Sequence, residues 1–260
     1  MIPQNSLQIT LAPGKKVFFA SDFHLGVPNA EASAARERKI IAWLDSIAPQ
    51  AGAVFLLGDI FDFWFEYRHV IPKGFLRFQS KLLALREADI PVIFFTGNHD
   101  MWMFDYFTQT LGIPIYREPQ SLQVGTQRLY IGHGDGLGHG DRHYKFLKKA
   151  FANPFLQRCF AALHPAWGMR LATGWSKRSR AQSSKEEETF QGENEWLWQY
   201  CKELHQHHPH DVYIFGHRHL VLDLPVGAHS RYINLGEWFS QCAYAYTDGQ
   251  ELVLSRYEEN

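Results

Sequence analysis

Five apolar runs of this chain end in the same way, and that pattern limits the folds the chain can adopt. Each run is short and rich in β-branched or aromatic residues, as buried strands are. Each then passes directly into Asp, His or Asn, usually beside a glycine that lets the backbone turn sharply. The runs are VFFASD (17–22), AVFLLGD (53–59), VIFFTGNHD (92–100), RLYIGHGD (128–135) and DVYIFGHRH (211–219). Because ligand sites of open α/β sheets lie outside the carboxyl ends of the strands, we expect these polar clusters to meet at one place.

Helical stretches alternate with the first three strands. Residues 31–48 and 73–88 carry apolar side chains at spacings that roughly fit one face of a helix. These side chains are Ile40, Ile41, Leu44 and Ile47 in the first stretch, and Leu76, Leu83 and Leu85 in the second. The alternation predicts a layered α/β fold.

The charge of residues 142–180 differs from that of the rest of the chain. This segment carries nine Lys or Arg residues and no Asp or Glu, although the formal net charge of the whole chain is only −1. Large apolar side chains recur there at helical spacing, with Pro154 and Pro165 as breaks. We predict a helical cap at residues 137–184, inserted in a core formed by residues 1–136 and 185–260.

Composition excludes several classes of protein. The 260 residues suffice for one large domain with a sizeable core. No apolar run of about 18 residues exists to span a bilayer, and the first residues lack the order of a secretory signal, so we expect a cytoplasmic protein. Three widely spaced cysteines argue against a disulfide framework and a Cys-based zinc site.

The polar strand ends together form a set of candidate metal ligands. They comprise carboxylates, imidazoles and one amide but no thiolate, which suits divalent ions such as Mn²⁺, Fe²⁺ or Zn²⁺. The candidates are Asp22, His24, Asp59, Asn98, His133, His217 and His219. The set exceeds the roughly four ligands of one zinc ion and fits two ions that share a bridging carboxylate. Only Asp22 and Asp59 are anionic, so two ions would keep a positive surplus that favours an anionic phosphate substrate.

The ordered motifs D-x-H, GD, GNHD, GH and GHxH resemble those of the calcineurin-like metallophosphoesterase family, whose fold is a layered αββα sandwich. The resemblance implies two divalent ions, with Mn²⁺ preferred, and attack on phosphorus by a hydroxide that bridges them. It assigns Asp22, His24, Asp59 and His219 to one ion, and Asp59, Asn98, His133 and His217 to the other. His99, oriented by Asp100, would face the substrate, and Asn98 and His99 would stabilise the transition state or leaving group.

Three stretches of the predicted cap narrow the resemblance further. HGDGLGHGDRHYKFLKK (133–149), NPFLQRCFAAL (153–163) and RLATGWSKRSRAQSSK (170–185) are similar to the UDP-2,3-diacylglucosamine diphosphatases of lipid A biosynthesis. This implies that a glycolipid nucleotide is cleaved to UMP and 2,3-diacylglucosamine 1-phosphate, with peripheral contact with the inner membrane and no protein partner. A basic and apolar cap suits such a substrate, because acyl chains need an apolar groove and phosphates need cations. The implied contacts to the head group or phosphates are Asp141, Tyr144, Ser179, Arg180 and Lys185.

Two features keep other substrates open. His99 stands where those diphosphatases commonly have arginine; an alkoxide leaving group benefits from a general acid, whereas a phosphate needs little protonation. Another phosphodiesterase or phosphatase is therefore an alternative. Cations interleaved with aromatic residues also occur on nucleic-acid surfaces, so a metal-dependent nuclease is a further alternative, although helical spacing favours a lipid groove over nucleic acid.

Three further features receive structural interpretations. We predict that the histidines of HQHHPHD (205–211) lie in a solvated loop and bind no metal. Asp62 and Asp135 are candidates to orient a ligand histidine. A non-catalytic scaffold ranks below an enzyme, because no ligand of the family pattern is missing.

Overall fold

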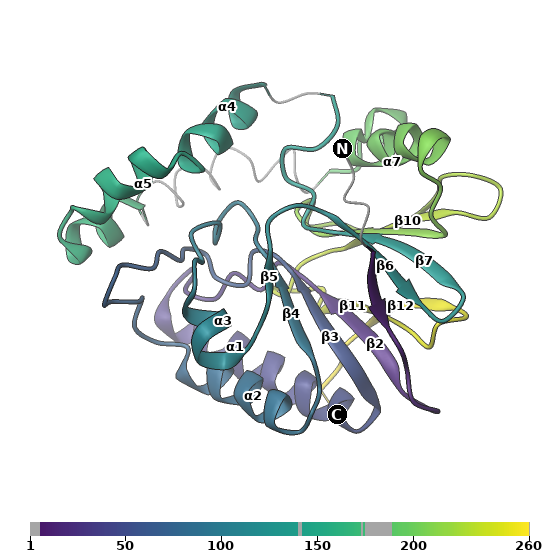
Figure 1. Ribbon diagram of the computed structural model, residues 1–260, viewed down its shortest axis with the longest axis horizontal. Helices are drawn as coiled ribbons and strands as arrows, with labels where there is room; N and C mark the ends of the chain where they lie inside the picture. Colours follow the sequence, from purple (N-terminus) through teal and green to yellow (C-terminus); the bar gives the residue numbers. More distant parts are fainter. Residues whose placement is uncertain (1–5, 140–141, 173, 175–188, 260) are drawn as a thin grey trace.

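The computed structural model describes residues 6–139, 142–172, 174 and 189–259. In this part of the chain two six-stranded sheets pack face to face, and helices cover both outer faces (Figure 1). The predicted layered α/β sandwich is confirmed.

One sheet carries the first three predicted strands. Its order is β12-β11-β2-β3-β4-β5; β2 to β5 run parallel, and β11 is antiparallel to both of its neighbours. The strands are β2 (Lys16–Ala20), β3 (Ala51–Leu57), β4 (Val92–Phe95), β5 (Ile115–Tyr116), β11 (Ala243–Thr247) and β12 (Leu252–Arg256).

The other sheet carries the last two predicted strands, β7 and β8, which lie side by side and parallel. Its order is β1-β6-β7-β8-β10-β9. The strands are β1 (Leu7–Ile9), β6 (Gln120–Val124), β7 (Gln127–Ile131), β8 (Val212–Phe215), β9 (Val221–Pro225) and β10 (Arg231–Leu235). The five polar strand ends thus come from two sheets, and they still meet, as the contact of His133 after β7 with Asp59 after β3 shows.

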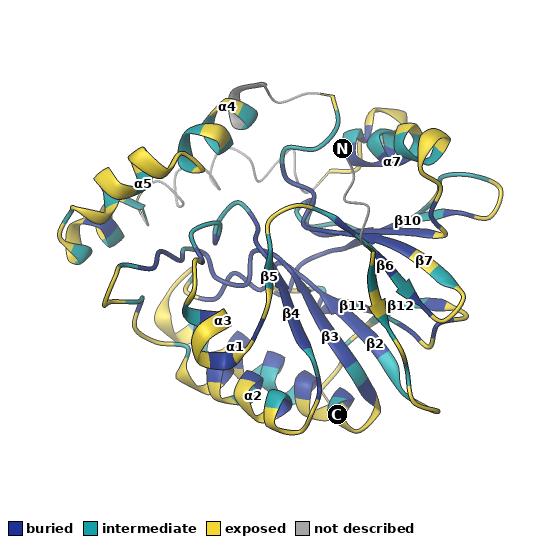
Figure 2. Cartoon of the chain, viewed as in Figure 1, coloured by how far each residue is buried: buried dark blue, intermediate teal, exposed yellow. Residues whose placement is uncertain are grey.

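Alternate residues of β2 show how its sheet is buried on both faces. Val17 and Phe19 belong to the core between the two sheets, whereas Phe18 and Ala20 belong to the core under the helices. The neighbouring strand β3 is buried along most of its length (Figure 2). Between the sheets the ring of Phe19 stacks on that of Phe55, with centroids 5.4 Å apart. Burial on both faces explains why the central strands read as continuous apolar runs instead of alternating ones.

Helices α1 (Ala30–Ile47), α2 (Leu76–Glu87) and α3 (Tyr106–Leu111) cover the first sheet, and α7 (Trp196–His207) covers the second (Figure 1). Two short 3₁₀ helices span Ala48–Gln50 and Gly192–Asn194. Asn29 caps α1, since its side chain accepts a hydrogen bond from the backbone nitrogen of Ala32 at 2.9 Å. Among the described residues no helix is both long and apolar enough to cross a membrane.

The segment predicted as a cap is helical where the structure describes it. It contains α4 (Arg142–Phe151), α5 (Pro154–Ala161) and a further helix over residues 165–172. Asn153 caps α5, because its side-chain oxygen accepts from the backbone nitrogens of Phe155 and Leu156. The division of the chain into core and cap domains stays a prediction.

The buried face of α2 differs from the expected one. Leu76 is 75% exposed and Leu83 is also exposed, whereas Phe78, Leu82 and Leu85 are buried. Leu76 and Leu83 are seven residues apart and do share a face, but that face points to solvent. Phe78, an aromatic residue outside the expected set, anchors the face that packs on the sheet.

The predicted solvated histidine loop is wrong in part. Helix α7 continues to His207, so His205 is helical, and its Nδ1 lies 3.1 Å from the hydroxyl of Tyr213. His210 is buried, and its Nε2 lies 2.8 Å from the Ser121 hydroxyl. Both histidines therefore pack against the second sheet, as structural residues do.

Two leucines of α2, one buried and one exposed, give a matched test of the observed face. Leu82 is fully buried, so Leu82→Ala should lower the free energy of unfolding by about 2–5 kcal/mol. Leu76→Ala should change it by less than about 0.5 kcal/mol, because its side chain is already in water. Urea denaturation of both variants measures this, and an equal loss in the two would contradict the assigned face.

Candidate metal centre

Unusual backbone conformations mark the strand ends. Asp22, His24, Asp59, His217 and His219 all have positive φ, between 43° and 70°. Residues with a Cβ atom adopt this left-handed conformation rarely, and each instance costs about 1–3 kcal/mol unless its surroundings impose it. Such residues concentrate at functional sites.

The loop after β2 is held by the loop after β3. The backbone nitrogens of Asp22, His24 and Leu25 donate to the carbonyl oxygens of Gly58, Asp59 and Ile60, at 3.0, 2.9 and 3.0 Å. Parallel pairing thus continues past the strands, which fixes Asp22 and His24 relative to Asp59.

Arg36 of α1 holds the same loop from its other side. Its guanidinium donates to the carbonyl oxygens of Phe23 at 2.7 Å, His24 at 2.6 Å and Val27 at 2.5 Å. It also lies 4.3 Å from the centroid of the Phe239 ring, and that ring stacks on the imidazole of His24. Sequence reasoning missed both residues, because a lone arginine in a helix reads as a solvated charge and a lone loop phenylalanine as a packing residue.

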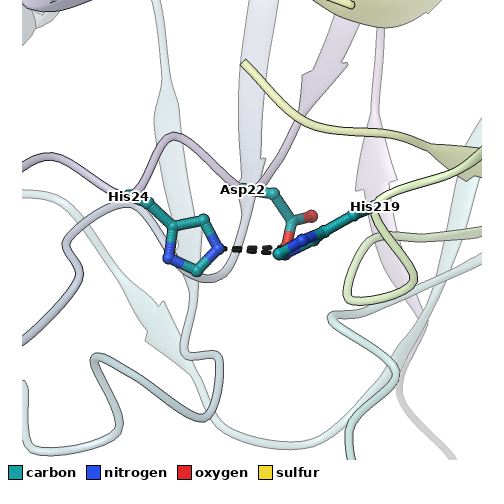
Figure 3. A group of neighbouring side chains, drawn as sticks. All are labelled: Asp22, His24 and His219. Atoms are coloured by element: carbon teal, nitrogen blue, oxygen red, sulfur yellow. Dashed lines mark hydrogen bonds and ion pairs between the residues drawn. The ribbon is translucent and has the colours of Figure 1, made fainter. Parts of the chain in front are cut away.

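One group of candidate ligands comprises Asp22, His24 and His219 (Figure 3). The Nε2 atoms of the two histidines lie 3.0 Å apart. Oδ1 of Asp22 lies 3.3 Å from Nε2 of His219 and 3.8 Å from Nε2 of His24. Three ligand atoms of the type that binds divalent metals therefore face one another, two from buried residues and one from the partly exposed His219.

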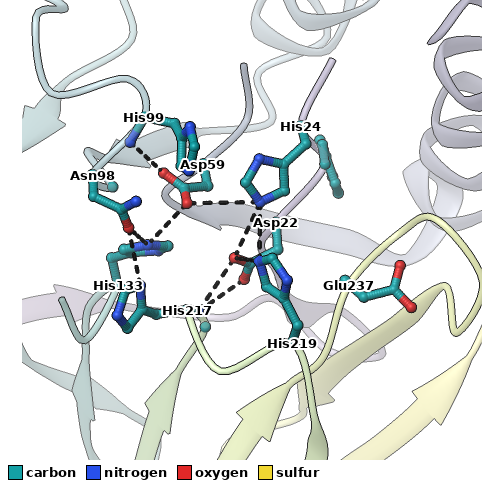
Figure 4. Close-up of polar contacts among 12 residues, drawn as sticks. Asp22, His24, Asp59, Asn98, His99, His133, His217, His219 and Glu237 are labelled. Carbon is teal, nitrogen blue, oxygen red and sulfur yellow. Dashed lines mark hydrogen bonds and ion pairs between the residues drawn. The ribbon is translucent and has the colours of Figure 1, made fainter. Parts of the chain in front are cut away.

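A second group lies beside the first (Figure 4). Nε2 of His133 lies 3.3 Å from Oδ2 of Asp59 and 3.1 Å from Oδ1 of Asn98. The same Asn98 oxygen lies 2.9 Å from Nδ1 of His217. Oδ2 of Asp59 also lies 3.7 Å from Nε2 of His24, so this carboxylate stands between the two groups. The structure brings together all seven candidate ligands.

The chemistry of these atoms fits a bound cation. Nδ1 of His133 lies 2.8 Å from the carbonyl oxygen of Leu57, which only accepts, so that nitrogen carries a proton. In a neutral ring Nε2 then presents its lone pair to the oxygens of Asp59 and Asn98, which are also acceptors. Three acceptors that face one another need a cation between them, either a proton or a metal ion.

The pKa shifts of His133 and Asp59 also indicate that this cluster favours a positive charge. Burial disfavours a charged His133, yet the neighbouring Asp59 outweighs burial and raises the pKa of His133 to about 10. Burial opposes ionisation of Asp59, but His133 and His99 hold the pKa of that carboxyl well below its usual value. By contrast, burial lowers the pKa of His217 to about 3, so its ring is neutral at pH 7.

His99 contacts Asp62, and its expected orientation by Asp100 stays a prediction. Nδ1 of His99 lies 3.0 Å from the carbonyl oxygen of Asp62 and 3.8 Å from its Oδ1. The same carboxylate oxygen lies 3.6 Å from Nδ1 of His24, so Asp62 lies beside two histidines, and its role in orienting them stays a prediction. His24, Asp59 and His99 also lie close enough together to hold a metal.

Asp100 is buried and organises backbone. Its carboxylate accepts hydrogen bonds from the backbone nitrogens of Gly97 and Ile60, both at 2.8 Å, and of Asp59 and Phe61, both at 3.3 Å. These contacts join the loop after β4 to the loop after β3. Asp100 thus supports the turn that presents Asp59.

An apolar cavity of about 550 Å³ adjoins the metal centre. Asn98, His99, Asp62 and Trp102 lie on the core side of its wall, and Leu147, Phe151, Leu156, Phe160 and Leu171 lie on the cap side. Trp102 donates from Nε1 to the carbonyl oxygen of Phe151 at 2.9 Å, and its ring packs on that of Phe160. Nζ of Lys148 pairs with the carboxylate of Asp135 at 2.8 Å, so Asp135 holds the cap, and its expected role in orienting a histidine stays a prediction.

The predicted substrate contacts cannot be placed in the same way. Asp141, Ser179, Arg180 and Lys185 lie outside the described residues. Tyr144 belongs to α4, but its side chain lies outside the described part of the structure. These assignments stay predictions.

The layered α/β sandwich gathers His, Asp and Asn side chains at its strand ends, and this arrangement is that of a metal-dependent hydrolase. Residues 15–221 match the model of the calcineurin-like phosphoesterases. The chain belongs to the calcineurin-like phosphoesterase family, as the resemblance of its motifs implied.

Similar proteins include a UDP-2,3-diacylglucosamine hydrolase of Porphyromonas gingivalis, which is 37% identical over 94% of this chain and 98% of that protein. A UDP-2,3-diacylglucosamine hydrolase of Proteus mirabilis is 32% identical over 65% of this chain and 67% of that protein. Among solved structures, a dimetal phosphatase from Danio rerio matches with a TM-score of 0.46 at 14% identity, covering 94% of this chain and 96% of that one.

The close approach of Gly97 to Asp59 gives one test of the site. A Cβ atom at Gly97 would overlap the Asp59 carboxylate and lie 2.6 Å from its backbone nitrogen. Gly97→Ala should therefore displace Asp59 and weaken Mn²⁺ binding by about tenfold or more, as measured by calorimetric titration. Gly174→Ala is the control, because no described residue lies within 4 Å of its added Cβ. Unchanged Mn²⁺ affinity in the Gly97 variant would show that Asp59 is not held as described.

The raised pKa of His133 gives a test by proton release. Without metal the ring is protonated at pH 7.5, since that pH lies below its pKa of about 10, and a metal ligand must be neutral. Mn²⁺ binding should therefore release about one proton from this ring, and the binding enthalpy should differ between Tris and PIPES buffers, which differ in their enthalpies of ionisation. Much of this difference should vanish in His133→Gln. Equal enthalpies for the unmodified protein in both buffers would refute the protonation assigned to His133.

Proposed function

We propose that this chain hydrolyses the pyrophosphate bond of UDP-2,3-diacylglucosamine and releases UMP and 2,3-diacylglucosamine 1-phosphate. The observation that carries the proposal is the shared wall between the metal centre and the apolar cavity, since Asn98 and His99 border both. Phosphate chemistry and an acyl chain can therefore be accommodated side by side. The relative from Porphyromonas gingivalis, matched over 98% of its length, carries this substrate in its name.

The same proposal assigns two divalent ions, with Mn²⁺ preferred. Asp22, His24, Asp59 and His219 would hold one ion, and Asp59, Asn98, His133 and His217 the other. The position of the Asp59 carboxylate between His24 and His133 supports its bridging role. When bound, the ions would supply Lewis acidity to the phosphoryl oxygens and activate the attacking water.

Asn98 and His99 contribute as polar groups at the cavity wall. Oδ1 of Asn98 faces His133 and His217, so its Nδ2 is the donor left for a phosphoryl oxygen. Nδ1 of His99 faces the Asp62 carbonyl oxygen and carries the proton, and burial lowers the pKa of the ring to about 4. Nε2 of His99 is thus unprotonated at neutral pH. Such a ring suits a phosphate leaving group, which needs little protonation, better than an alkoxide.

The remaining predictions on the cap fit this function. Residues 137–184 would form the cap, with Asp141, Tyr144, Ser179, Arg180 and Lys185 at the head group or phosphates. Several large apolar side chains of the described cap are exposed, namely Phe146, Phe155, Leu156, Trp167 and Leu171. Beside the cationic residues of the same segment, they suit peripheral contact of a cytoplasmic enzyme with an anionic membrane surface.

The test is an assay of product identity. Purified protein with Mn²⁺ is incubated separately with UDP-2,3-diacylglucosamine, bis-p-nitrophenyl phosphate and single-stranded DNA, and products are identified by mass spectrometry. We expect UMP from the glycolipid and little reaction with the others. Asp59→Ala, which lacks the carboxylate between the two ligand groups, should bind less Mn²⁺ and release no UMP. Cleavage of the diester or DNA without UMP release would replace the proposal with a general phosphodiesterase or a nuclease.

A further inference from the structure

Arg218 lies between two candidate ligands, His217 and His219, and it is almost completely buried, with 2% of its surface exposed. Its Nε donates to Oε1 of Glu195 at 2.6 Å, and its Nη2 donates to Oε2 of the same residue at 3.0 Å. Nη2 also donates to the carbonyl oxygen of Thr189 at 3.1 Å. Glu195 has no exposed surface. The two residues thus form a buried, two-pronged ion pair.

A turn alone does not require this pair. Removing an arginine and a glutamate from water is costly, and a buried ion pair is often no more stable than apolar side chains of similar volume. The family pattern GHxH leaves the central position open, and a small polar residue would satisfy a turn. The positively charged side chain of Arg218 also belongs to the residue between His217 and His219, both of which are proposed to bind divalent metal ions. The cost of burying this pair calls for a role beyond stability.

The conformation of the turn indicates that role. His217 and His219 both have left-handed backbones, with φ of 70° and 49°, which relax to commoner conformations unless something holds them. The planar guanidinium fork fixes both the distance and the angle of the pair, which a lysine cannot do. Glu195 directly precedes α7, and the ring of the next residue, Trp196, lies 5.9 Å from the ring of His217 at an interplanar angle of 74°.

We propose that the Arg218–Glu195 pair is a positioning device that anchors the GHRH turn to the start of α7 and so aims His217 and His219 at the metals. Through Thr189, the first described residue after the cap, the same arginine also ties the turn to the chain that returns from the cap. Glu195 and Arg218 belong to none of the groups of candidate ligands, and the proposed role acts through the two histidines. The inference rests on the metal-binding role proposed above.

Replacing both Arg218 and Glu195 distinguishes a positioning role of the ion pair from a stabilising one. In Arg218→Met and in Glu195→Gln one partner is left buried without its counterpart, so both the melting temperature and Mn²⁺ binding should fall. In the double variant Arg218→Met/Glu195→Met an apolar pair replaces the ion pair. The melting temperature of the metal-free protein should then recover, while Mn²⁺ affinity should stay about 10–100-fold below that of the unmodified protein. Mn²⁺ titration calorimetry and thermal denaturation measure the two quantities.

A second variant covers the case in which the double variant does not fold. Arg218→Lys keeps the charge but loses the fork, and it should fold and bind Mn²⁺ about tenfold more weakly. The control is Arg231→Met, which breaks the ion pair with Asp223 at the opposite end of β8 and β10 and should leave Mn²⁺ affinity unchanged.

Each outcome decides the inference. Mn²⁺ affinity equal to that of the unmodified protein, in either the double variant or Arg218→Lys, overturns it. An equal loss in Arg231→Met would overturn it as well, because the effect would not be specific to the turn. Failure of the unmodified protein to bind Mn²⁺ would overturn the proposed function together with the inference, and this result is distinguishable because it appears before any substitution is made.

Discussion

Backbone hydrogen bonds between the loops after β2 and β3 are the constraint on which the metal centre depends. They hold Asp22, His24 and Asp59 in left-handed conformations that isolated loops would not keep. Arg36 fixes the first of these loops, and Asp100 fixes the second. The carboxylates and imidazoles consequently face one another before any ion arrives, and the proton of His133 then lies beside the Asp59 carboxylate.

The two sheets divide the centre between them. The loops after β2, β3 and β4 supply Asp22, His24, Asp59 and Asn98, and the loops after β7 and β8 supply His133, His217 and His219. The apolar core between the sheets, with the stacked rings of Phe19 and Phe55, therefore sets the distance between the two halves of the ligand set. A bound ion would contact both halves, so metal binding and the packing of the sandwich stabilise each other.

The strand ends could be predicted because their signal is local: an apolar run followed directly by Asp, His or Asn. The division of the strands between two sheets could not be predicted, because strand pairing joins residues that are far apart in the chain. Leu76 was placed on the wrong face because its neighbours, not its own spacing, decide which side of α2 meets the sheet. Arg36 and the backbone role of Asp100 were missed for the same reason, since each acts on carbonyl or amide groups that no sequence motif names.

The docking of the cap has a pharmacological consequence. One short segment, residues 98–102, carries Asn98 and His99 and also provides Trp102, on which Phe151 and Phe160 rest. A group that chelates a metal ion recognises the ion more than the protein around it, so it would fit many metal-dependent hydrolases. Here a molecule without a chelating group could fill the apolar cavity and still lie against Asn98 and His99. Its selectivity would come from the shape of the cap.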